Sequence, residues 1–341
     1  MNDNLEQDLK IGVVGAGSWG TALANLLAGK GYELDLWVFE PEVCRQIEKQ
    51  RENKVFLPGV TLSPNLKPTN DLAAAVGQKD VVLVVVPSHV MRLVMQQAAS
   101  HLTPQTVLIS AAKGIENGTH LTMSGVIRET VAAISDKRLA VLSGPSFAKE
   151  VARKAPTVVA VASKDLALAE RVQNIFATPY FRVYANPDMI GVELGGAIKN
   201  VIAIAAGVID GLGLGLNTRA ALITRGLTEI QRLGSEMGAD PRTLAGIAGV
   251  GDLILTCTGD LSRNHTVGKK IGEGMRLEAI LGEMRMVAEG VKTAKSVYNL
   301  SRQLGVEMPI CHEMYRILYE DLPPQEAVYR LMTRDLKREW E

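Results

Sequence analysis

The chain has 341 residues, of which 47% are apolar, 22% charged and 4% aromatic. These proportions exclude an intrinsically disordered or collagen-like chain, and the length is sufficient for about two domains. The 37 Lys and Arg balance the 37 Asp and Glu, so no bulk charge favours nucleic acid or an anionic membrane surface as a partner. A small anion held at one local site remains compatible with this balance.

The three cysteines, Cys44, Cys257 and Cys311, are far apart and form no CxxC pair. This spacing argues against a disulfide framework or a structural zinc site, and no other cluster has metal-ligand spacing. The N-terminal MNDNLEQDLK is polar and acidic, unlike a secretion signal. The longest apolar runs, 81–86 and 201–206, are far shorter than a bilayer span. We therefore expect a cytoplasmic protein without a membrane segment.

Strand and helix patterns alternate in the first half of the chain. Runs of apolar or β-branched residues predict strands at 10–14, 33–39, 81–86, 107–110, 140–142 and 157–162. The run 81–86 is apolar throughout, which is typical of a parallel strand buried on both faces. The alternation predicts an α/β fold with a Rossmann-type, parallel, doubly wound sheet.

Strand patterns fade after about residue 187, where segments rich in Ala, Leu, Ile, Glu and Arg take over. Their periodicity predicts helices at 188–210, 217–237, 241–248, 265–281, 289–304 and 309–320. We place a boundary at Asn186-Pro187, which divides the chain into a dinucleotide-binding Rossmann domain, 1–187, and an all-α domain, 188–341.

A GxGxxG string, Gly15-Ala16-Gly17-Ser18-Trp19-Gly20, follows the first predicted strand and opens a helix. In this context Gly15 permits a tight turn, Gly17 admits a pyrophosphate close to the backbone, and Gly20 lets the helix pack near the strand. The alternative is a structural turn with spare glycines. The context favours a dinucleotide-binding loop.

Phe39 ends the second predicted strand and Glu40 follows it, at the place where the adenosine ribose of a dinucleotide is met. A carboxylate at Glu40 accepts from the ribose 2′-hydroxyl and repels a 2′-phosphate, and Phe39 offers no positive charge. This pair favours NAD over NADP. The alternative for Glu40 is an exposed residue that caps the next helix.

Two further patterns receive a structural interpretation. The glycine-rich segment 211–215 follows an apolar helix rather than a strand, so we interpret it as a helix–helix connection. The five histidines have no recognisable acidic partner, and we propose no histidine as a general acid.

Two lysines occupy positions suited to catalysis. Lys113, in AAKGIE, follows a predicted strand and so lies at the carboxyl edge of the sheet, where ligands bind. Lys199 lies within an apolar helix rich in small residues, where a lysine is costly unless it is paired or functional. The alternative for Lys199 is a structural lysine that extends its ammonium group to solvent.

Three other strings supply polar groups. The first, 143–148, follows a strand and presents small residues and backbone N–H groups. In the second, Asp252 is an acid preceded by glycines. In the third, Ser262, Arg263 and Asn264 precede or open a helix, and a guanidinium with two neutral donors and free helix N–H groups forms an anion site. The alternative for this third string is a capping turn with a surface arginine.

Eight strings, in this order, closely resemble the bacterial-type NAD(P)-dependent glycerol-3-phosphate dehydrogenases. They are GAGSWGTALA, AAKGIE, SGPSFAKEV, VELGGAIKNVIAIAAG, LNTRAALITRG, AGVGDLILTCTG, SRNHTVG and VAEGVKTA. The resemblance covers about residues 10–320. It implies interconversion of sn-glycerol 3-phosphate and dihydroxyacetone phosphate, mainly toward the former as a phospholipid backbone. It also implies a Rossmann domain, a helical substrate-binding and dimerisation domain, and commonly a homodimer.

The resemblance also implies roles for individual residues, which we carry over position by position. Lys199 is the proton donor and acceptor, and Lys113 touches both substrate and cofactor. Other substrate-binding residues are Gly144, Ser146, Asp252, Ser262, Arg263 and Asn264. Other cofactor-binding residues are Ser18, Trp19, Phe39, Ala148, Arg263, Val287 and Glu289. Similar enzymes often carry Arg or His where Phe39 stands, so its presence here puts a preference for NADP in doubt.

The chemistry of ketone reduction agrees with these roles. Hydride transfer builds negative charge on the carbonyl oxygen, which a Lys199 ammonium can stabilise and protonate. Burial and the nearby Lys113 are expected to depress the pKa of Lys199, and Asp252 to limit that depression. Two alternatives stay open: a reductase of another β-hydroxy acid, and a nicotinamide-sensing protein without turnover. A methyltransferase with a similar glycine loop would not need the two lysines.

Overall fold

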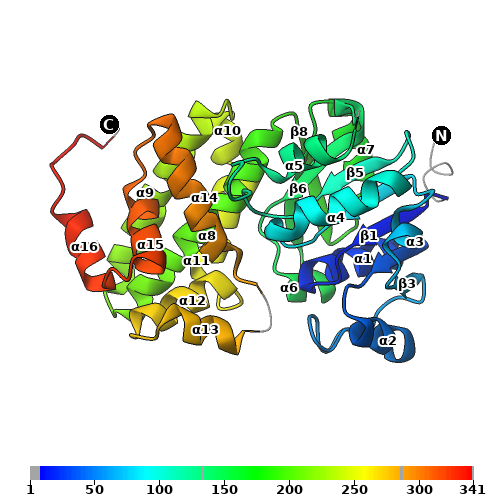
Figure 1. Ribbon diagram of the computed structural model, residues 1–341, viewed down its shortest axis with the longest axis horizontal. Coiled ribbons are helices and arrows are strands. Elements are labelled where there is room, and N and C mark those ends of the chain that lie inside the picture. Colours follow the sequence, from blue (N-terminus) through cyan, green and yellow to red (C-terminus); the bar gives the residue numbers. More distant parts are fainter. Residues whose placement is uncertain (1–7, 133, 285–286, 340–341) are drawn as a thin grey trace.

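The computed structural model describes residues 8–132, 134–284 and 287–339. All of its strands precede residue 187, and only helices follow (Figure 1). Residues 1–7 of the predicted Rossmann domain and residues 340–341 of the predicted all-α domain lie outside the described part. The strands are β1 (Ile11–Val14), β2 (Leu34–Trp37), β3 (Leu66–Thr69), β4 (Val81–Val84), β5 (Val107–Ser110), β6 (Leu139–Ser143), β7 (Thr157–Ala162) and β8 (Phe181–Asn186).

The eight strands form one sheet in the order β3-β2-β1-β4-β5-β6-β7-β8. Strands β1 to β6 are parallel, which confirms the doubly wound arrangement. However, β7 pairs antiparallel with β6, and β8 follows β7 in parallel. The connection between β6 and β7 holds only the short helix α6 (Ala148–Ala152), which packs on α1 (Ser18–Lys30). The chain therefore enters β7 at the same end of the sheet at which it leaves β6.

Helices cover both faces of the sheet, and this explains why its central strands are buried and almost entirely apolar. All residues of β1, β4, β5 and β6 are buried. One face packs against α1 and α7, through side chains such as Leu23 and Val172, and the other against α3, α4 and α5, through side chains such as Met91 and Val126. The remaining elements of this half are α2 (Pro41–Gln50), α3 (Leu72–Val76), η1 (Ser88–Val90), α4 (Met91–Ala98), η2 (Ala99–His101), α5 (Met123–Thr130), η3 (Asp136–Arg138) and α7 (Leu166–Phe176).

The helical half is built around α8 (Met189–Gly211), which contacts α9, α11, α12, α14 and α15 (Figure 1). The helices after α8 are α9 (Gly215–Glu236), α10 (Pro241–Leu244), η4 (Ile247–Gly251), α11 (Asp252–Thr258), α12 (Arg263–Gly272), α13 (Leu277–Glu283), α14 (Glu289–Leu304), α15 (Pro309–Tyr319) and α16 (Pro324–Met332). The glycines between α8 and α9 connect two helices, as predicted.

Helix α8 is long and apolar enough to cross a membrane by length and composition, yet its most apolar window is entirely buried within the fold. A helix that is apolar on all sides and surrounded by others is a core helix. Glycines in α8 and α12 let these two helices approach each other closely. A Cβ on Gly207 would lie 2.1 Å from the carbonyl oxygen of His265, and one on Gly268 would lie 1.9 Å from that of Ile204. This contact fixes α12 against α8.

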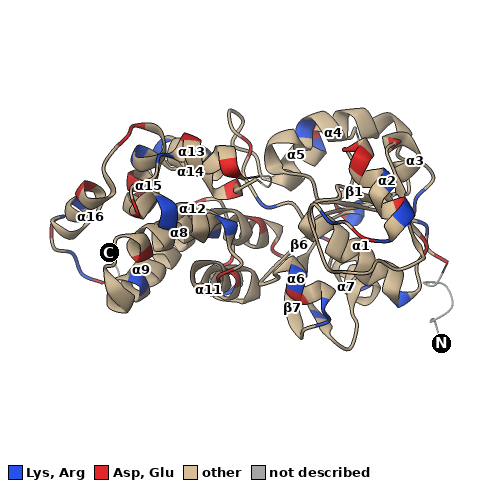
Figure 2. Cartoon of the chain, turned by 90° about the horizontal axis from the view of Figure 1, so that it is seen from below, with Lys and Arg blue, Asp and Glu red and all other residues tan. Residues whose placement is uncertain are grey.

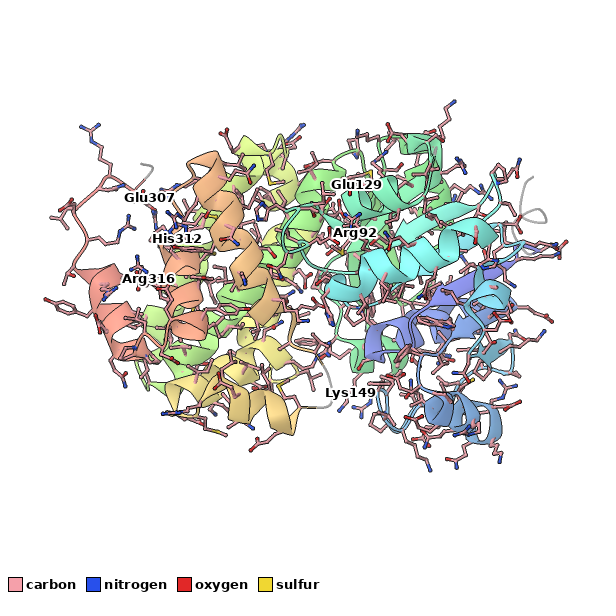
Figure 3. The ribbon with its side chains drawn as sticks, in the orientation of Figure 1. Arg92, Glu129, Lys149, Glu307, His312 and Arg316 are labelled. Atoms are coloured by element: carbon pink, nitrogen blue, oxygen red, sulfur yellow. The ribbon has the colours of Figure 1, made fainter. Side chains whose placement is uncertain are left out.

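Charges of both signs are interspersed over both halves of the molecule (Figure 2). Several of them pair at the surface, such as Arg92 with Glu129 at 2.7 Å (Figure 3) and Lys337 with Glu307 at 2.8 Å. Exposed pairs of this kind contribute little to stability. The balanced charge of the sequence thus corresponds to a mixed exterior, and the informative charges are the buried ones.

Candidate active site

The glycine loop lies at the point where the strand order reverses, because β1 is flanked by β2 and β4. Ligands of open α/β sheets bind in the crevice beyond the carboxyl ends of the strands at this point. Gly15 has φ +114°, and a Cβ there would lie 2.9 Å from the carbonyl oxygen of Val85. A Cβ on Gly20 would lie 1.9 Å from the carbonyl oxygen of Gly15. Both glycines therefore have the roles that the sequence predicts.

The same loop fits a dinucleotide. Gly17 is the N-cap of α1, and a Cβ there would meet no described atom within 4 Å, so a phosphate has room to reach the backbone. The indole Nε1 of Trp19 is buried without a hydrogen-bond partner in the described part of the chain. The Ser18 hydroxyl donates to the carbonyl oxygen of Phe56 at 2.6 Å, which ties the loop to the segment after α2.

Phe39 and Glu40 lie just beyond β2, which ends at Trp37, two residues before the predicted end of this strand. The Phe39 ring is 73% exposed and meets Trp37 edge-on, with the ring centroids 6.0 Å apart. Glu40 occupies the N-cap position of α2, but its side chain makes no capping hydrogen bond there. Its carboxylate is therefore not committed to capping, which weakens the alternative interpretation of this residue.

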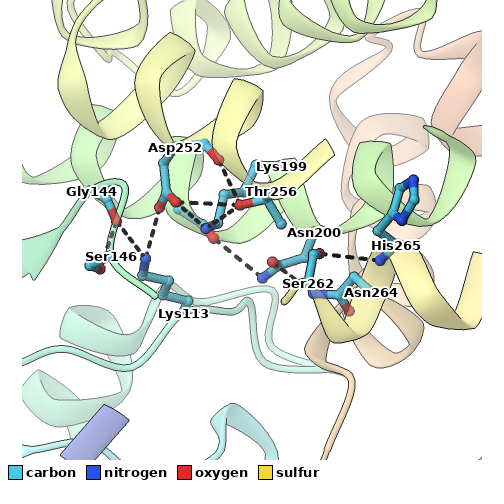
Figure 4. A network of polar contacts seen from close by, with 11 residues as sticks. Lys113, Gly144, Ser146, Lys199, Asn200, Asp252, Thr256, Ser262, Asn264 and His265 are labelled. Carbon is cyan, nitrogen blue, oxygen red and sulfur yellow. Dashed lines mark hydrogen bonds and ion pairs between the residues drawn. The ribbon is translucent and has the colours of Figure 1, made fainter. Parts of the chain in front are cut away.

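Lys199 is 5% exposed and donates hydrogen bonds to Asp252 and to the Thr256 hydroxyl, the latter at 2.9 Å (Figure 4). Asp252 is 1% exposed, and its second carboxylate oxygen accepts from Lys113 at 2.8 Å. One buried carboxylate thus holds two lysines, one from each half of the chain. This arrangement contradicts the interpretation of Lys199 as a structural lysine that reaches solvent.

Burial lowers the pKa of Lys199 to about 7, and the positive charge of Lys113 adds to this effect, while Asp252 opposes it. The direction and its causes are those expected from the sequence. A lysine with a pKa near neutrality exchanges a proton readily at working pH. Thr256 donates to the backbone carbonyl of Asp252 at 2.6 Å and so is oriented to accept from Lys199.

Backbone geometry places these side chains. Asp252 opens α11 directly after η4, a π-helical turn, and such turns are frequent at functional sites. In α8, Gly195 makes room for this turn, because a Cβ there would lie 2.6 Å from the carbonyl oxygen of Ala248. Gly196 makes room for Ser143 at the end of β6, because a Cβ on Gly196 would lie 2.4 Å from Oγ of Ser143. The two glycines bring Lys199 to the sheet edge.

The loop after β6 lines the same place. The carbonyl oxygen of Gly144 accepts from Lys113 at 3.1 Å and from the Ser146 hydroxyl at 2.9 Å (Figure 4). Gly144 has φ +149°, and a Cβ there would lie 2.9 Å from Cα of Val159. Ala148 begins α6 and lies next to α1. This string therefore runs from Gly144, which contacts Lys113, to α6, which packs on the glycine-loop helix α1.

The predicted anion site lies at the N-terminus of α12. Ser262 is the N-cap and accepts from the backbone N–H of His265 at 3.2 Å, while Arg263 is exposed in the first turn. Asn264 accepts from the backbone N–H of Gly290 at 2.9 Å. It also donates to the Asn200 side chain at 2.9 Å (Figure 4). Because Asn200 follows Lys199 in α8, this bond links the anion site to the lysine.

Glu289 begins α14, and Val287 lies two residues before it. Burial raises the pKa of Glu289, against the opposing effect of Ser88 and Arg263. The Glu289 carboxylate accepts from the Ser88 hydroxyl at 2.5 Å and from the Ser88 backbone N–H at 3.1 Å. Glu289 thus lies between the loop after β4 and the anion site.

The structure contradicts the prediction that no histidine has an acidic partner. Nε2 of His265 lies 2.8 Å from Asp210, which also binds Arg219 at 2.9 Å. The partners are 55 positions apart, and the close packing of α12 on α8 brings them together. Sequence reasoning also missed Thr256, Asn200 and Ser88. Thr256 follows Asp252 by one helical turn, and this spacing is a signal that the sequence does carry.

A glycine loop at a switch point, facing a buried lysine–carboxylate pair, is the arrangement of a nucleotide-dependent oxidoreductase. Two family models match: NAD-dependent glycerol-3-phosphate dehydrogenase N-terminus over residues 10–169, and the C-terminus over residues 188–329. The chain belongs to the NAD-dependent glycerol-3-phosphate dehydrogenase family.

Individual relatives are similar to this chain over nearly the whole length of both sequences. Glycerol-3-phosphate dehydrogenase [NAD(P)+] of Geobacter metallireducens is 59% identical over 97% of this chain and 98% of its own. The protein of the same description from Syntrophobacter fumaroxidans is 58% identical over 97% of each chain. A crystal structure of glycerol-3-phosphate dehydrogenase from Coxiella burnetii is 40% identical, covers 96% of this chain and 100% of that one, and has a TM-score of 0.92.

Proposed function

We propose that this chain catalyses reversible hydride transfer between NAD(P)H and dihydroxyacetone phosphate, which forms sn-glycerol 3-phosphate for phospholipid synthesis. The observation that carries the proposal is the buried pair of Lys199 and Asp252, which links to Lys113 on one side and, through Asn200, to Asn264 in the predicted anion site on the other. Family membership supports the same substrate and cofactor class.

The cofactor supplies the hydride when it is bound. Lys199 in its ammonium form donates a hydrogen bond to the substrate carbonyl oxygen and then its proton, and it takes a proton back in the reverse direction. Asp252 keeps enough positive charge on Lys199 for this step, and Lys113 adds a second positive charge near the developing oxyanion. Lys199, Lys113 and Asp252 are the proposed catalytic residues.

The phosphate of the substrate belongs at the N-terminus of α12. Ser262, Arg263, Asn264 and the free N–H groups of this helix supply a positive charge and several donors. Lys113, Gly144 and Ser146 bind the opposite side of the substrate. Binding energy from the phosphate, remote from the reacting carbon, then orients the carbonyl for reaction.

The cofactor lies along the switch-point crevice. The residues proposed to contact it are Gly15, Gly17, Ser18, Trp19, Gly20, Phe39, Glu40, Lys113, Ala148, Arg263, Val287 and Glu289. NAD is favoured over NADP because Phe39 carries no charge and the Glu40 carboxylate is not used in capping. We further propose a division at Asn186-Pro187 into nucleotide-binding and helical domains, a cytoplasmic location, and a homodimer with no nucleic-acid or membrane partner. The resemblance of the sequence to its family supports the dimer.

The substrate class is tested by comparing three ketones with NADH and the purified chain: dihydroxyacetone phosphate, dihydroxyacetone and the β-keto acid acetoacetate. We expect turnover with the first, and a kcat/KM at least about 100-fold lower for dihydroxyacetone, because the phosphate contacts are lost. Faster turnover of acetoacetate would favour the β-hydroxy acid reductase instead. Binding of NADH without turnover of any ketone would favour the sensing protein.

A further inference from the structure

Two loops flank the switch-point crevice, one after β1 and the other after β4. The second contains Pro87 and Ser88, and Ser88 begins the short helix η1. Ser88 is 3% exposed although it lies at the sheet edge where ligands bind. No pattern in the sequence singled out this serine.

Ser88 binds both carboxylate oxygens of Glu289. Its backbone N–H donates to Oε1 at 3.1 Å and its hydroxyl donates to Oε2 at 2.5 Å. The two residues are 201 positions apart, in different halves of the chain. Two hydrogen bonds from one residue, one to each carboxylate oxygen, fix the position and the plane of this carboxylate.

The pair of Ser88 and Glu289 lies beside the segment of Lys113 on one side and the predicted anion site on the other. A Cβ on Gly114, the residue after Lys113, would lie 2.4 Å from Cβ of Ser88 and 3.6 Å from Oε2 of Glu289. On the other side, the N–H of Gly290 donates to Asn264 at 2.9 Å, and Asn264 in turn donates to Asn200 at 2.9 Å. The start of α14 is thus held by the β4 loop on one side and by the anion site on the other.

We propose that Ser88 is a positioning residue that orients Glu289 toward the dinucleotide and, through Gly290 and Asn264, aligns the anion site with the cofactor crevice. Ser88 itself is not a catalytic residue. The inference rests on the proposed function, because that function assigns Glu289 to the cofactor and Asn264 to the substrate phosphate. Loss of the Ser88 hydroxyl should weaken binding of both ligands more than it slows the chemical step.

The chain offers a matched control for contact between its two halves. Ser124 donates to Glu193 through its backbone N–H at 2.7 Å and its hydroxyl at 2.6 Å. Both residues are 7% exposed, and this pair also joins the two halves. Glu193 precedes Lys199 by about 9 Å along α8 and points about 120° away around its axis. Ser124→Ala therefore removes the same kind of contact away from the ligands.

The test compares the wild type, Ser88→Ala and Ser124→Ala in two measurements. The Kd for NADH is obtained from the change in intrinsic protein fluorescence as NADH is added, and KM and kcat are obtained from steady-state kinetics with dihydroxyacetone phosphate. We expect Ser88→Ala to raise both the Kd for NADH and the KM for dihydroxyacetone phosphate about tenfold, with kcat changed less than about threefold. Ser124→Ala should leave all three near the wild type, even if its unfolding temperature falls. Gly114→Ala, which crowds Ser88 from the other side, should reproduce the weaker binding of NADH.

Two results would overturn the proposal: equal effects of Ser88→Ala and Ser124→Ala on the NADH Kd, or a Ser88→Ala variant that loses kcat with both binding constants unchanged. If the wild type does not reduce dihydroxyacetone phosphate, the proposed function fails. The NADH titration still decides whether Ser88 organises the dinucleotide crevice, because it needs no turnover.

Discussion

Lys199 of α8 and Asp252 of α11 form a buried ion pair, and the same carboxylate binds Lys113 from the loop after β5. The pair therefore joins the helical half to the edge of the sheet at the point where a dinucleotide loop opens. A buried charge pair is costly unless every charge has a partner. Here one carboxylate serves two ammonium groups, which leaves an excess of positive charge for an anionic substrate.

Replacing Lys199 should remove the proton donor while the glycine loop stays intact. We expect Lys199→Ala to lower kcat with dihydroxyacetone phosphate by about 1,000-fold or more, since general acid catalysis and oxyanion stabilisation are lost together. The Kd for NADH, measured by fluorescence titration, should change less than about threefold. A variant with a rate near that of the wild type would refute this role for Lys199.

The pKa of Lys199, about 7, predicts opposite pH dependences for the two directions of the reaction. Ketone reduction needs the ammonium form, so kcat for reduction should fall as pH rises through about 7. Alcohol oxidation needs the neutral amine, so its kcat should rise over the same range. Initial rates in both directions across this range provide the measurement, and parallel profiles would contradict the assignment.

Asp252 raises the pKa of Lys199, so its removal should have the reverse effect. In Asp252→Asn, burial and the Lys113 charge act without opposition, and the reductive pH profile should shift toward lower pH. Its maximal rate should also fall, because both lysines lose their carboxylate partner. An unchanged or alkaline-shifted profile would show that Asp252 does not set the charge of Lys199.

Arg263 should act mainly on binding of the phosphate. We expect Arg263→Ala to raise the KM for dihydroxyacetone phosphate by about 10- to 100-fold, the loss typical of charge-assisted hydrogen bonds. At saturating NADH, its activity with dihydroxyacetone, which has no phosphate, should hardly change. Arg316→Ala is the matched control, because Arg316, labelled in Figure 3, lies in α15 and pairs there with Glu313. Equal effects of the two substitutions would exclude a specific phosphate site at Arg263.

Close packing of α12 on α8 should be essential for stability. Gly268→Ala would place a Cβ 1.9 Å from the carbonyl oxygen of Ile204, and overpacking of this kind costs about 1–3 kcal/mol. The control is Gly29→Ala in α1, where a Cβ meets no described atom within 4 Å. Chemical denaturation should show a lower free energy of unfolding for the first variant alone. Equal stability of the two variants would contradict the close contact.

Much of the fold follows from local patterns in the sequence. The apolar runs predict β5 and β7 with their observed bounds, because strands buried on both faces carry a continuous apolar signal. In contrast, β3 and β8 were missed. Both are edge strands, β3 contains Pro68, and β8 alternates buried with exposed residues in its first part. The predicted helix 265–281 is divided into α12 and α13, and Gly274 adopts φ +95° at the break.

For the site, the sequence predicts residues whose chemistry is unusual for their surroundings. A lysine in an apolar helix and an acid preceded by glycines are such residues, and Lys199 and Asp252 do meet. Ser88, Asn200 and Asp210 look ordinary in sequence. Their roles depend on partners 201, 64 and 55 positions away, and only the packing of α12 and α14 against α8 and the sheet edge reveals these contacts.

The most direct test of the whole account is to add dihydroxyacetone phosphate to the purified chain with NADH or NADPH and to follow the absorbance of the reduced nicotinamide. The account predicts a loss of absorbance that matches, mole for mole, the sn-glycerol 3-phosphate formed, and faster turnover with NADH than with NADPH. No loss of absorbance with either cofactor would contradict it.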